Sequence, residues 1–183
     1  MHSNTHEPVV LARSCEAIEI PSGRKIELFQ GTSLTIIQAL GGSYTVMTEQ
    51  GAMASIAGKD ADAVGKPVPP PIKIEGELTV EAIEKLVWQQ LKTCYDPEIP
   101  HNIVDLGLVY ECKLVSAVPE GQQVQIKMTL TAQGCGMGDW LRSDVKSKVA
   151  GVPGVQDVNV ELVFDPPWDR SKMHPALKRE YGV

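Results

Sequence analysis

The stretch that decides the predicted fold is residues 124–141, VQIKMTLTAQGCGMGDWL. Its first eight residues alternate apolar and polar side chains, which is the period-two pattern of a strand with one buried face. Residues 134–138, GCGMG, contain three glycines, and Asp139 is a favourable N-cap for a helix. Apolar residues then repeat at helical spacing, at Leu141, Val145 and Val149. The stretch therefore predicts a strand, a glycine-rich loop and a helix in succession.

Cys135 lies in this loop, just before the predicted helix. The neighbouring glycines let the backbone turn sharply and approach another group. The N-terminus of a helix carries partial positive charge and free N–H donors, which favour a thiolate over a thiol. We therefore interpret Cys135 as an activated sulfur that could bind a soft metal. The alternative interpretation is a small buried hydrophobic residue in a turn, as most free cysteines are.

The composition excludes several classes of protein. The 183 residues, 43% hydrophobic and 22% charged, suit one ordinary domain or two small soluble ones. A net charge of −6 argues against a nucleic-acid surface, and no apolar run approaches the roughly 20 residues that span a bilayer. The first residues, MHSNTHEPVV, lack a basic segment followed by an apolar one, so we expect no secretory signal and a cytoplasmic location.

The four cysteines are widely spaced, and no C-x-x-C motif occurs. A preformed zinc or thioredoxin-type motif is therefore not expected, nor are disulfides in a reducing cytosol. Cys94 and Cys112 fall in a predicted helix and a predicted strand, where we expect them to belong to the core. Cys15 lies in a segment of short strands and indicates nothing specific.

The chain divides into two predicted domains. Residues 1–65 contain short apolar runs with turn signals roughly every eight to ten residues, which predicts a small, mostly-β, barrel-like module that scaffolds or docks. Residues 66–76, KPVPPPIKIEG, form a stiff proline-rich linker. Residues 77–183 predict the order α-β-β-α-β-α, a three-stranded mixed sheet with helices on one face, so the fold class is α+β.

Boundaries in the second domain follow from local signals. Thr79 caps the first helix, and Pro97 ends it because the residue before proline avoids helical geometry. Residues 104–115 predict the first strand, and residues 155–164 predict the third. Residues 165–169, DPPWD, form a rigid exit into a short last helix with Met173, Leu177 and Tyr181.

Several polar residues are candidates for the site. Asp96 and Glu98 lie in the loop after the first helix, where they either form a solvated turn or supply a carboxylate to Cys135. Thr129 and Thr131 are expected on the strand face opposite the core, with Thr131 able to reach the cysteine loop. His101 is expected to be a solvated loop residue.

Three motifs in the second half resemble a known family. They are DPEIPHNIVDLGLVY at residues 96–110, MTLTAQGC at 128–135 and PGVQDVNVELVFDPPW at 153–168. Together they resemble the small α/β domain of the PaaD/SufT-like metal–sulfur cluster biosynthesis family, over residues 77–183. Upstream, IPSG at Ile20 and QALGGSYTV at Gln38 resemble the N-terminal extension of the SufT branch.

The resemblance implies a factor that matures iron–sulfur proteins by carrying or inserting clusters, or by docking their targets. The family's reactive cysteine corresponds to Cys135, which would also be the metal ligand. Its acidic loop corresponds to Asp96 and Glu98, and its strand threonines to Thr129 and Thr131. The expected cargo is a transiently bound iron–sulfur cluster, and the expected partners are client apoproteins and other cluster-assembly proteins.

We expect the assembly factor not to be an enzyme. Two other functions are alternatives to it. An enzyme with Cys135 as nucleophile needs a base, usually histidine, and only His101 and His174 are available in this half. A pure adaptor would use its surface alone, without thiol or metal chemistry.

One cysteine cannot supply the roughly four ligands of a cluster, and a small sheet leaves free edges, so we expect a homodimer.

Overall fold

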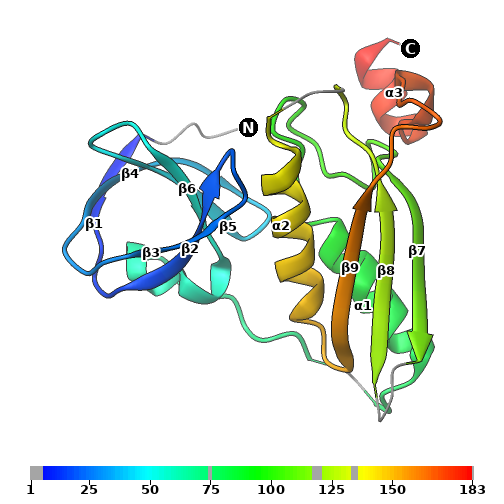
Figure 1. The fold of residues 1–183 in the computed structure, drawn as a ribbon, viewed down its shortest axis with the longest axis horizontal. Coiled ribbons are helices and arrows are strands. Elements are labelled where there is room, and N and C mark those ends of the chain that lie inside the picture. Colours follow the sequence, from blue (N-terminus) through cyan, green and yellow to red (C-terminus); the bar gives the residue numbers. More distant parts are fainter. Residues whose placement is uncertain (1–5, 74–75, 117–120, 133–135, 183) are drawn as a thin grey trace. The chain divides into compact units, whose positions relative to one another are not determined.

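A computed structural model describes residues 6–73, 76–116, 121–132 and 136–182 of the chain. The chain splits into two compact units, Met1–Pro71 and Ile72–Val183 (Figure 1). The boundary between them falls inside the proline-rich stretch 66–76. Within the described ranges, no helix combines the length and the apolar character needed to cross a membrane.

The first unit is one antiparallel sheet of six strands in the order β1-β4-β5-β6-β2-β3. Its elements are β1 (Glu7–Val10), β2 (Cys15–Ile20), β3 (Lys25–Leu28), β4 (Ser33–Leu40), β5 (Ser43–Thr48), β6 (Met53–Ile56) and the 3-10 segment η1 (Gly58–Val64). Gly41 and Gly42 both have positive φ, 57° and 75°, and they join β4 to β5 in the two-residue turn that suits antiparallel strands.

Alternation along these strands creates the core of the first unit. On β4, Leu34 and Ile36 are buried while Ser33 is exposed. The buried side chains pack with Val46 of β5 and Ile56 of β6. Within this unit, a bidentate ion pair joins the segment after β1 to η1: Arg13 Nε and Nη2 donate to the two Asp62 oxygens at 2.7 and 2.6 Å.

The second unit contains a mixed three-stranded sheet, as predicted. Strand β8 pairs antiparallel with β7 and parallel with β9, so the order is β7-β8-β9. The elements are α1 (Val80–Leu91), β7 (Val109–Ser116), β8 (Gln122–Met128), α2 (Gly138–Ala150), β9 (Val155–Leu162), the 3-10 turn η2 (Arg170–Lys172) and α3 (Pro175–Tyr181).

One face of this sheet is apolar and the other is polar. Val124, Ile126 and Met128 of β8 are buried, and they alternate with exposed Gln125 and Lys127. The buried face meets the helical layer, in which α2 packs on β9 and α1 packs on α2. Gly138 at the start of α2 lies close to the segment that follows β8, because a Cβ there would come within 2.9 Å of Leu130 Cδ1.

Three predicted boundaries in the second unit were wrong. Helix α1 ends at Leu91 rather than near Pro97, so Cys94 lies in the turn that follows the helix. Residues 104–108 form a turn and not a strand, because the Asn102 side chain accepts the backbone N–H groups of Val104 and Asp105. Helix α2 starts at Gly138 with Met137 as its N-cap, so Asp139 lies in its first turn.

The C-terminal segment packs on this turn. Trp168 Nε1 donates to the Leu106 carbonyl at 2.8 Å, and the Tyr110 hydroxyl donates to the Pro166 carbonyl at 2.8 Å. Gly107 has a φ of 70° and lies against the Lys172 backbone, where a Cβ would clash. Residues that follow β9 are therefore held on residues 102–110 rather than extending the sheet.

We expect limited trypsin digestion to cut first after Lys73, which is exposed and lies beside the boundary between the units. Lys66 precedes a proline and is a poor site, and Lys127 lies within β8, whose backbone is paired on both sides. Mass spectrometry of the early fragments would identify the site. Protection at Lys73 together with early cutting after Lys127 would contradict the division at the linker.

Candidate functional site

Asp96 is the centre of the candidate site, in the turn that follows α1. It is only 5% exposed. Its Oδ1 accepts the backbone N–H groups of Glu98 at 2.9 Å and Ile99 at 2.8 Å, and its own N–H donates to the His101 carbonyl at 3.0 Å. The Asp-Pro turn expected from the sequence is therefore present, but it holds the carboxylate in a buried position rather than a solvated one.

Thr131 reaches this carboxylate from the segment that follows β8. Its hydroxyl lies 3.3 Å from Asp96 Oδ2 and 3.4 Å from Oδ1, in donor geometry. The two residues are 35 positions apart, so their contact depends on the tertiary fold. The structure thus brings Asp96 to the beginning of the loop in which Cys135 occurs, although Cys135 itself falls outside the described residues, as do its neighbours 133 and 134.

The Asp96 carboxyl is in an environment that opposes its ionisation. Burial raises the pKa of Asp96, while the N–H groups of Ile99 and Glu98 and the Thr131 hydroxyl act in the opposite direction; burial has the largest effect. A carboxyl in this state can accept or release a proton closer to neutral pH than an exposed aspartate can, and it can also act as an oxygen ligand.

Glu98 contributes its backbone N–H to the Asp96 carboxyl, and the charge of its side chain adds to the raised pKa of Asp96, whereas Thr129 is held elsewhere. The Thr129 side chain is 1% exposed, and its backbone N–H donates to the Leu108 carbonyl at 2.9 Å. The expectation that Thr129 lies on the exposed face was wrong, because β8 ends at Met128 and the next two residues both turn into the protein. The Glu98 side chain is exposed beside the Asp96 turn.

His101 is not a solvated loop residue as expected. Its ring meets the Tyr181 ring edge to face, with centroids 5.6 Å apart, and its Nε2 lies 3.6 Å from a carboxylate oxygen of Glu180. His174, the other histidine of this half, accepts the Ala176 N–H and caps α3. Both histidines thus interact with the C-terminal helix α3.

The three described cysteines have thiols that stay protonated near neutral pH. Burial raises the pKa of Cys94, which has no exposed surface, well above its ordinary value. Burial, aided by Glu84, raises the pKa of Cys112 to about 11. Burial also raises the pKa of Cys15. The core role predicted for Cys94 is confirmed, whereas Cys112 is only half-buried on β7. None of these environments favours nucleophilic attack or metal binding.

Sequence reasoning missed two charged residues, Asp144 and Lys148 of α2. Lys148 Nζ lies 2.9 Å from Asp144 Oδ2 and donates to the Thr93 carbonyl at 2.9 Å. Thr93 is three residues before Asp96, so the helix is tied to the turn that holds the candidate site. The signal was an acid and a base four residues apart on a helix, which by itself usually means an exposed pair.

The donor set for a metal is small. Across residues 6–73, 76–116, 121–132 and 136–182, no three His, Cys, Asp or Glu side chains are grouped so that they could hold a metal ion. A cluster bound near Asp96 would therefore need ligands from Cys135 and from another molecule.

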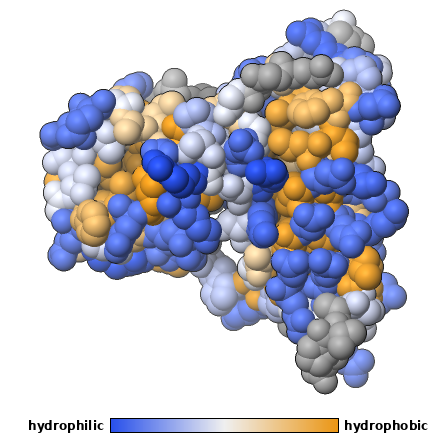
Figure 2. All heavy atoms as spheres, in the orientation of Figure 1, coloured by the Kyte–Doolittle hydropathy of each residue, from blue (hydrophilic) through white to orange (hydrophobic). Residues whose placement is uncertain are grey.

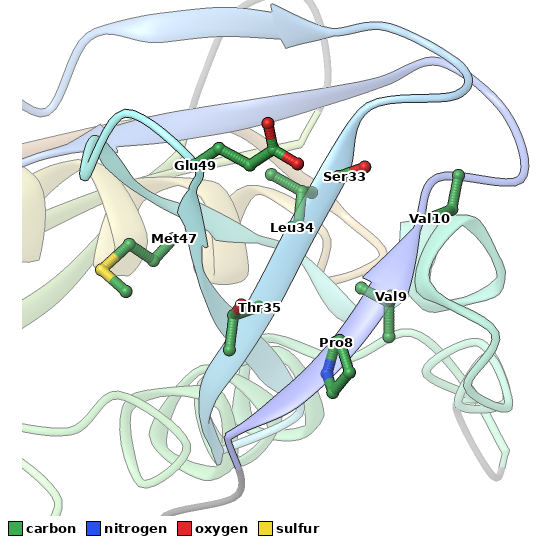
Figure 3. A pocket seen from close by; sticks show the side chains of 8 residues that line it. All are labelled: Pro8, Val9, Val10, Ser33, Leu34, Thr35, Met47 and Glu49. Atoms are coloured by element: carbon green, nitrogen blue, oxygen red, sulfur yellow. The ribbon is translucent and has the colours of Figure 1, made fainter.

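The first unit carries a separate pocket on its sheet (Figure 3). Its volume is about 370 Å³, and its lining comes from β1, β4 and β5: Pro8, Val9, Val10, Ser33, Leu34, Thr35, Met47 and Glu49. Glu49 is the one titratable side chain in that lining. In the face shown in Figure 2, hydrophilic residues separate the hydrophobic areas on the surface of each unit.

Comparisons with known proteins match the second unit. A family model described as iron-sulfur cluster assembly protein matches residues 84–162. The chain is 40% identical over 99 residues to the Fe-S protein maturation auxiliary factor of Porphyromonas gingivalis, covering 54% of this chain and 90% of that protein. It is 36% identical over 103 residues to the auxiliary factor YitW of Bacillus subtilis, covering 56% and 97%.

A third relative is the Fe-S protein maturation auxiliary factor SufT of Staphylococcus aureus, 41% identical over 88 residues, which are 48% of this chain and 96% of that protein. These three relatives are thus matched almost completely by about half of the chain. The resemblance of residues near Ile20 and Gln38 to a SufT extension remains a prediction.

Proposed function

The chain belongs to the iron–sulfur cluster assembly protein family that includes these maturation auxiliary factors, and from this premise we propose how it acts. The protein works in the assembly and maturation of iron–sulfur proteins. In our proposal it carries a cluster, or helps to insert it, with Cys135 as the sulfur ligand and Asp96 and Thr131 beside that cysteine. The cluster is cargo that passes to a client apoprotein.

The observation that supports this proposal is the Asp96–Thr131 contact. It places a buried carboxyl, whose pKa is raised by burial, where the segment leading to Cys135 begins. A thiol must lose its proton to bind iron, and it must regain one when the cluster leaves. A carboxyl that is held near Cys135 is suited to take and return this proton, or to hold iron weakly through oxygen.

The number of ligands explains why the proposal includes partners. Thiolates are the soft ligands that iron–sulfur clusters prefer, and a cluster needs about four ligands. This chain offers one activated cysteine, and the described part has no group of three ligating side chains. The remaining ligands would come from a client, an assembly protein or a second copy of the chain. Weak and shared binding of this kind favours release of the cargo.

The two competing functions have less support. The names of the relatives describe auxiliary factors, which agrees with a role that is not catalytic. An enzyme with a Cys135 nucleophile would need a base, but His101 and His174 both interact with α3. The adaptor remains the second candidate, because the pocket of the first unit offers apolar side chains and the outer edge of β1 for docking. A cytoplasmic location and a homodimer remain predictions.

Anaerobic reconstitution tests the proposal. We expect the full chain, incubated with ferrous iron, sulfide and a small thiol that completes the ligand set, to gain visible sulfur-to-iron absorption. We also expect it to speed activation of an apo client enzyme relative to iron and sulfide alone. Bovine serum albumin at the same thiol concentration is the control. Absorption and activation no greater than the control values would reject the carrier and leave the adaptor.

A further inference from the structure

Helix α2 contains an ion pair that is unusual because both of its side chains are largely buried. Asp144 and Lys148 are four residues apart, a spacing that normally gives an exposed pair. Here the two side chains are only 8% and 13% exposed, with Nζ and Oδ2 2.9 Å apart. By contrast Arg142 and Asp139, on the same helix, form an ion pair of 2.9 Å with side chains about half exposed, at 48% and 62%.

The buried pair contacts the turn that follows α1. Lys148 Nζ donates to the Thr93 carbonyl at 2.9 Å. Asp144 is near enough to the buried Cys94 thiol to raise its pKa, while that thiol donates to the Gln90 carbonyl at 3.6 Å. Thr93 therefore meets α2 at the level of Lys148, and Cys94 meets it one helical turn nearer the N-terminus. The chain from Thr93 toward Asp96 thus runs toward the end of α2 that follows the Cys135 loop.

From Cys94 onward, backbone hydrogen bonds fix the turn. The Cys94 carbonyl accepts the Ile103 N–H at 2.9 Å, and Asp96 N–H donates to the His101 carbonyl at 3.0 Å. Tyr95 forms a β-bridge with Asn102. A shift of the Thr93 carbonyl relative to α2 would therefore move the whole turn, including the Asp96 carboxyl.

We propose that the Asp144–Lys148 pair is a positioning element, which holds the Asp96 carboxyl against Thr131 by anchoring the Thr93 carbonyl to α2. The inference rests on the proposed function, since it assigns a purpose to the position of Asp96. Stability alone is a weak reason to bury two charges, because well-packed apolar side chains of similar volume often serve as well or better. A geometric role explains the pair, since one ammonium group bonds both to its own helix and to the turn.

The test replaces both charges together, as Asp144→Leu with Lys148→Met, so that neither partner is left buried alone. Arg142→Met is the matched control, because it breaks the exposed ion pair of the same helix. The direct readout is an NMR titration of the Glu98 and Ile99 amides, whose N–H groups bond to Asp96 Oδ1 and so report its protonation. Melting temperature and support of an iron–sulfur enzyme in cells are measured for the same variants.

We expect the double variant to stay folded while the Asp96 titration moves to lower pH, because a loosened turn exposes the carboxyl whose burial raises its pKa. We expect support of the enzyme to fall about tenfold, the lower end of the effect of residues that orient a metal ligand. The control is expected to show the wild-type titration and wild-type enzyme support.

A wild-type titration in the folded double variant would overturn the inference, whatever the enzyme support. Full enzyme support by both the double variant and Asp96→Asn would instead remove Asp96 from the proposed function, and the titration would still test whether the pair positions the carboxyl. A second double variant, Asp144→Asn with Lys148→Met, keeps the shape of the aspartate and removes the ammonium group that bonds to the Thr93 carbonyl. If the first double variant does not fold, the Asp96 titration is measured on this variant instead. A shift to lower pH supports the inference, and a wild-type titration overturns it.

Discussion

The variant Cys135→Ala is expected to abolish support of iron–sulfur enzymes while the protein stays folded. Cluster binding depends on the sulfur atom, because a methyl group cannot ligate iron. Replacing one sulfur by hydrogen in a loop is expected to cost about 1 kcal/mol or less of unfolding free energy, because no large cavity forms. The measurements are the activity of a cluster-dependent enzyme in cells that carry each variant, and the melting temperature of the purified protein.

Cys112→Ala is the matched control for this variant. Cys112 is half-buried on β7, and its pKa of about 11 leaves it protonated, so enzyme support should persist. Alkylation at several pH values, mapped by mass spectrometry, should also label Cys135 faster than Cys112 or Cys94. Normal enzyme activity with Cys135→Ala would remove the thiolate from the mechanism and favour the adaptor. A collapse of the melting temperature would instead make Cys135 a core residue.

The sheet of the second unit could be predicted because its pattern is local. Alternation from Val124 to Met128 gave β8 with one buried face, and the spacing of Leu141, Val145 and Val149 gave the buried face of α2. The long helical connection from β8 to β9 indicated parallel pairing, which the mixed sheet shows. In these segments the buried residues recur with the period of the strand or helix that they form, so the sequence pattern indicates the secondary structure directly.

The errors occur where hydrogen bonds or packing of particular side chains, rather than the apolar pattern, decide the structure. Residues 104–108 are apolar enough for a strand, but the Asn102 side chain satisfies two backbone N–H groups and starts a turn. Thr129 continues the alternation of β8 in the sequence, yet the strand has already ended. No local pattern distinguishes an exposed Asp–Lys pair from the buried Asp144–Lys148 pair, since only the packing of α2 beside Thr93 buries it.

The candidate site was predicted in part. The sequence indicated that Asp96 starts a turn and that it is a candidate carboxylate, and the structure adds its burial and its contact with Thr131. That contact joins residues 35 positions apart, so it could not follow from local spacing. Glu98 and Thr129 belong to the same motifs, but Glu98 reaches Asp96 through its backbone N–H while its side chain is exposed, and the Thr129 backbone bonds to Leu108.

The variant Asp96→Asn is expected to lower support of iron–sulfur enzymes about tenfold to a hundredfold, the range for groups that orient or polarise a metal ligand. At neutral pH it should leave the free energy of unfolding unchanged or raise it. The amide oxygen can still accept the N–H groups of Glu98 and Ile99, and no buried charge remains. The amide nitrogen can donate to the Thr131 hydroxyl.

The pH dependence of stability gives the sharper test of this variant. Burial raises the pKa of Asp96 in the folded protein above the value of about 4 for an unfolded aspartate. Between these two values the folded state binds more protons than the unfolded state, so wild-type stability falls as pH rises through that window. Asparagine does not titrate, so the stability of Asp96→Asn relative to wild type should increase from about pH 4 and then level off above the folded pKa.

Urea unfolding of both proteins between about pH 4 and pH 8 measures this difference. Asp96→Ala is the control, because it also does not titrate but leaves two buried N–H groups without their acceptor; its free energy of unfolding should lie about 1–3 kcal/mol below that of Asp96→Asn at every pH. A relative stability of Asp96→Asn that rises toward acid pH would mean that the folded protein favours the ionised carboxylate, which contradicts the environment described here. Full enzyme support by Asp96→Asn would show that the amide serves as well as the acid, and would exclude proton transfer by this residue.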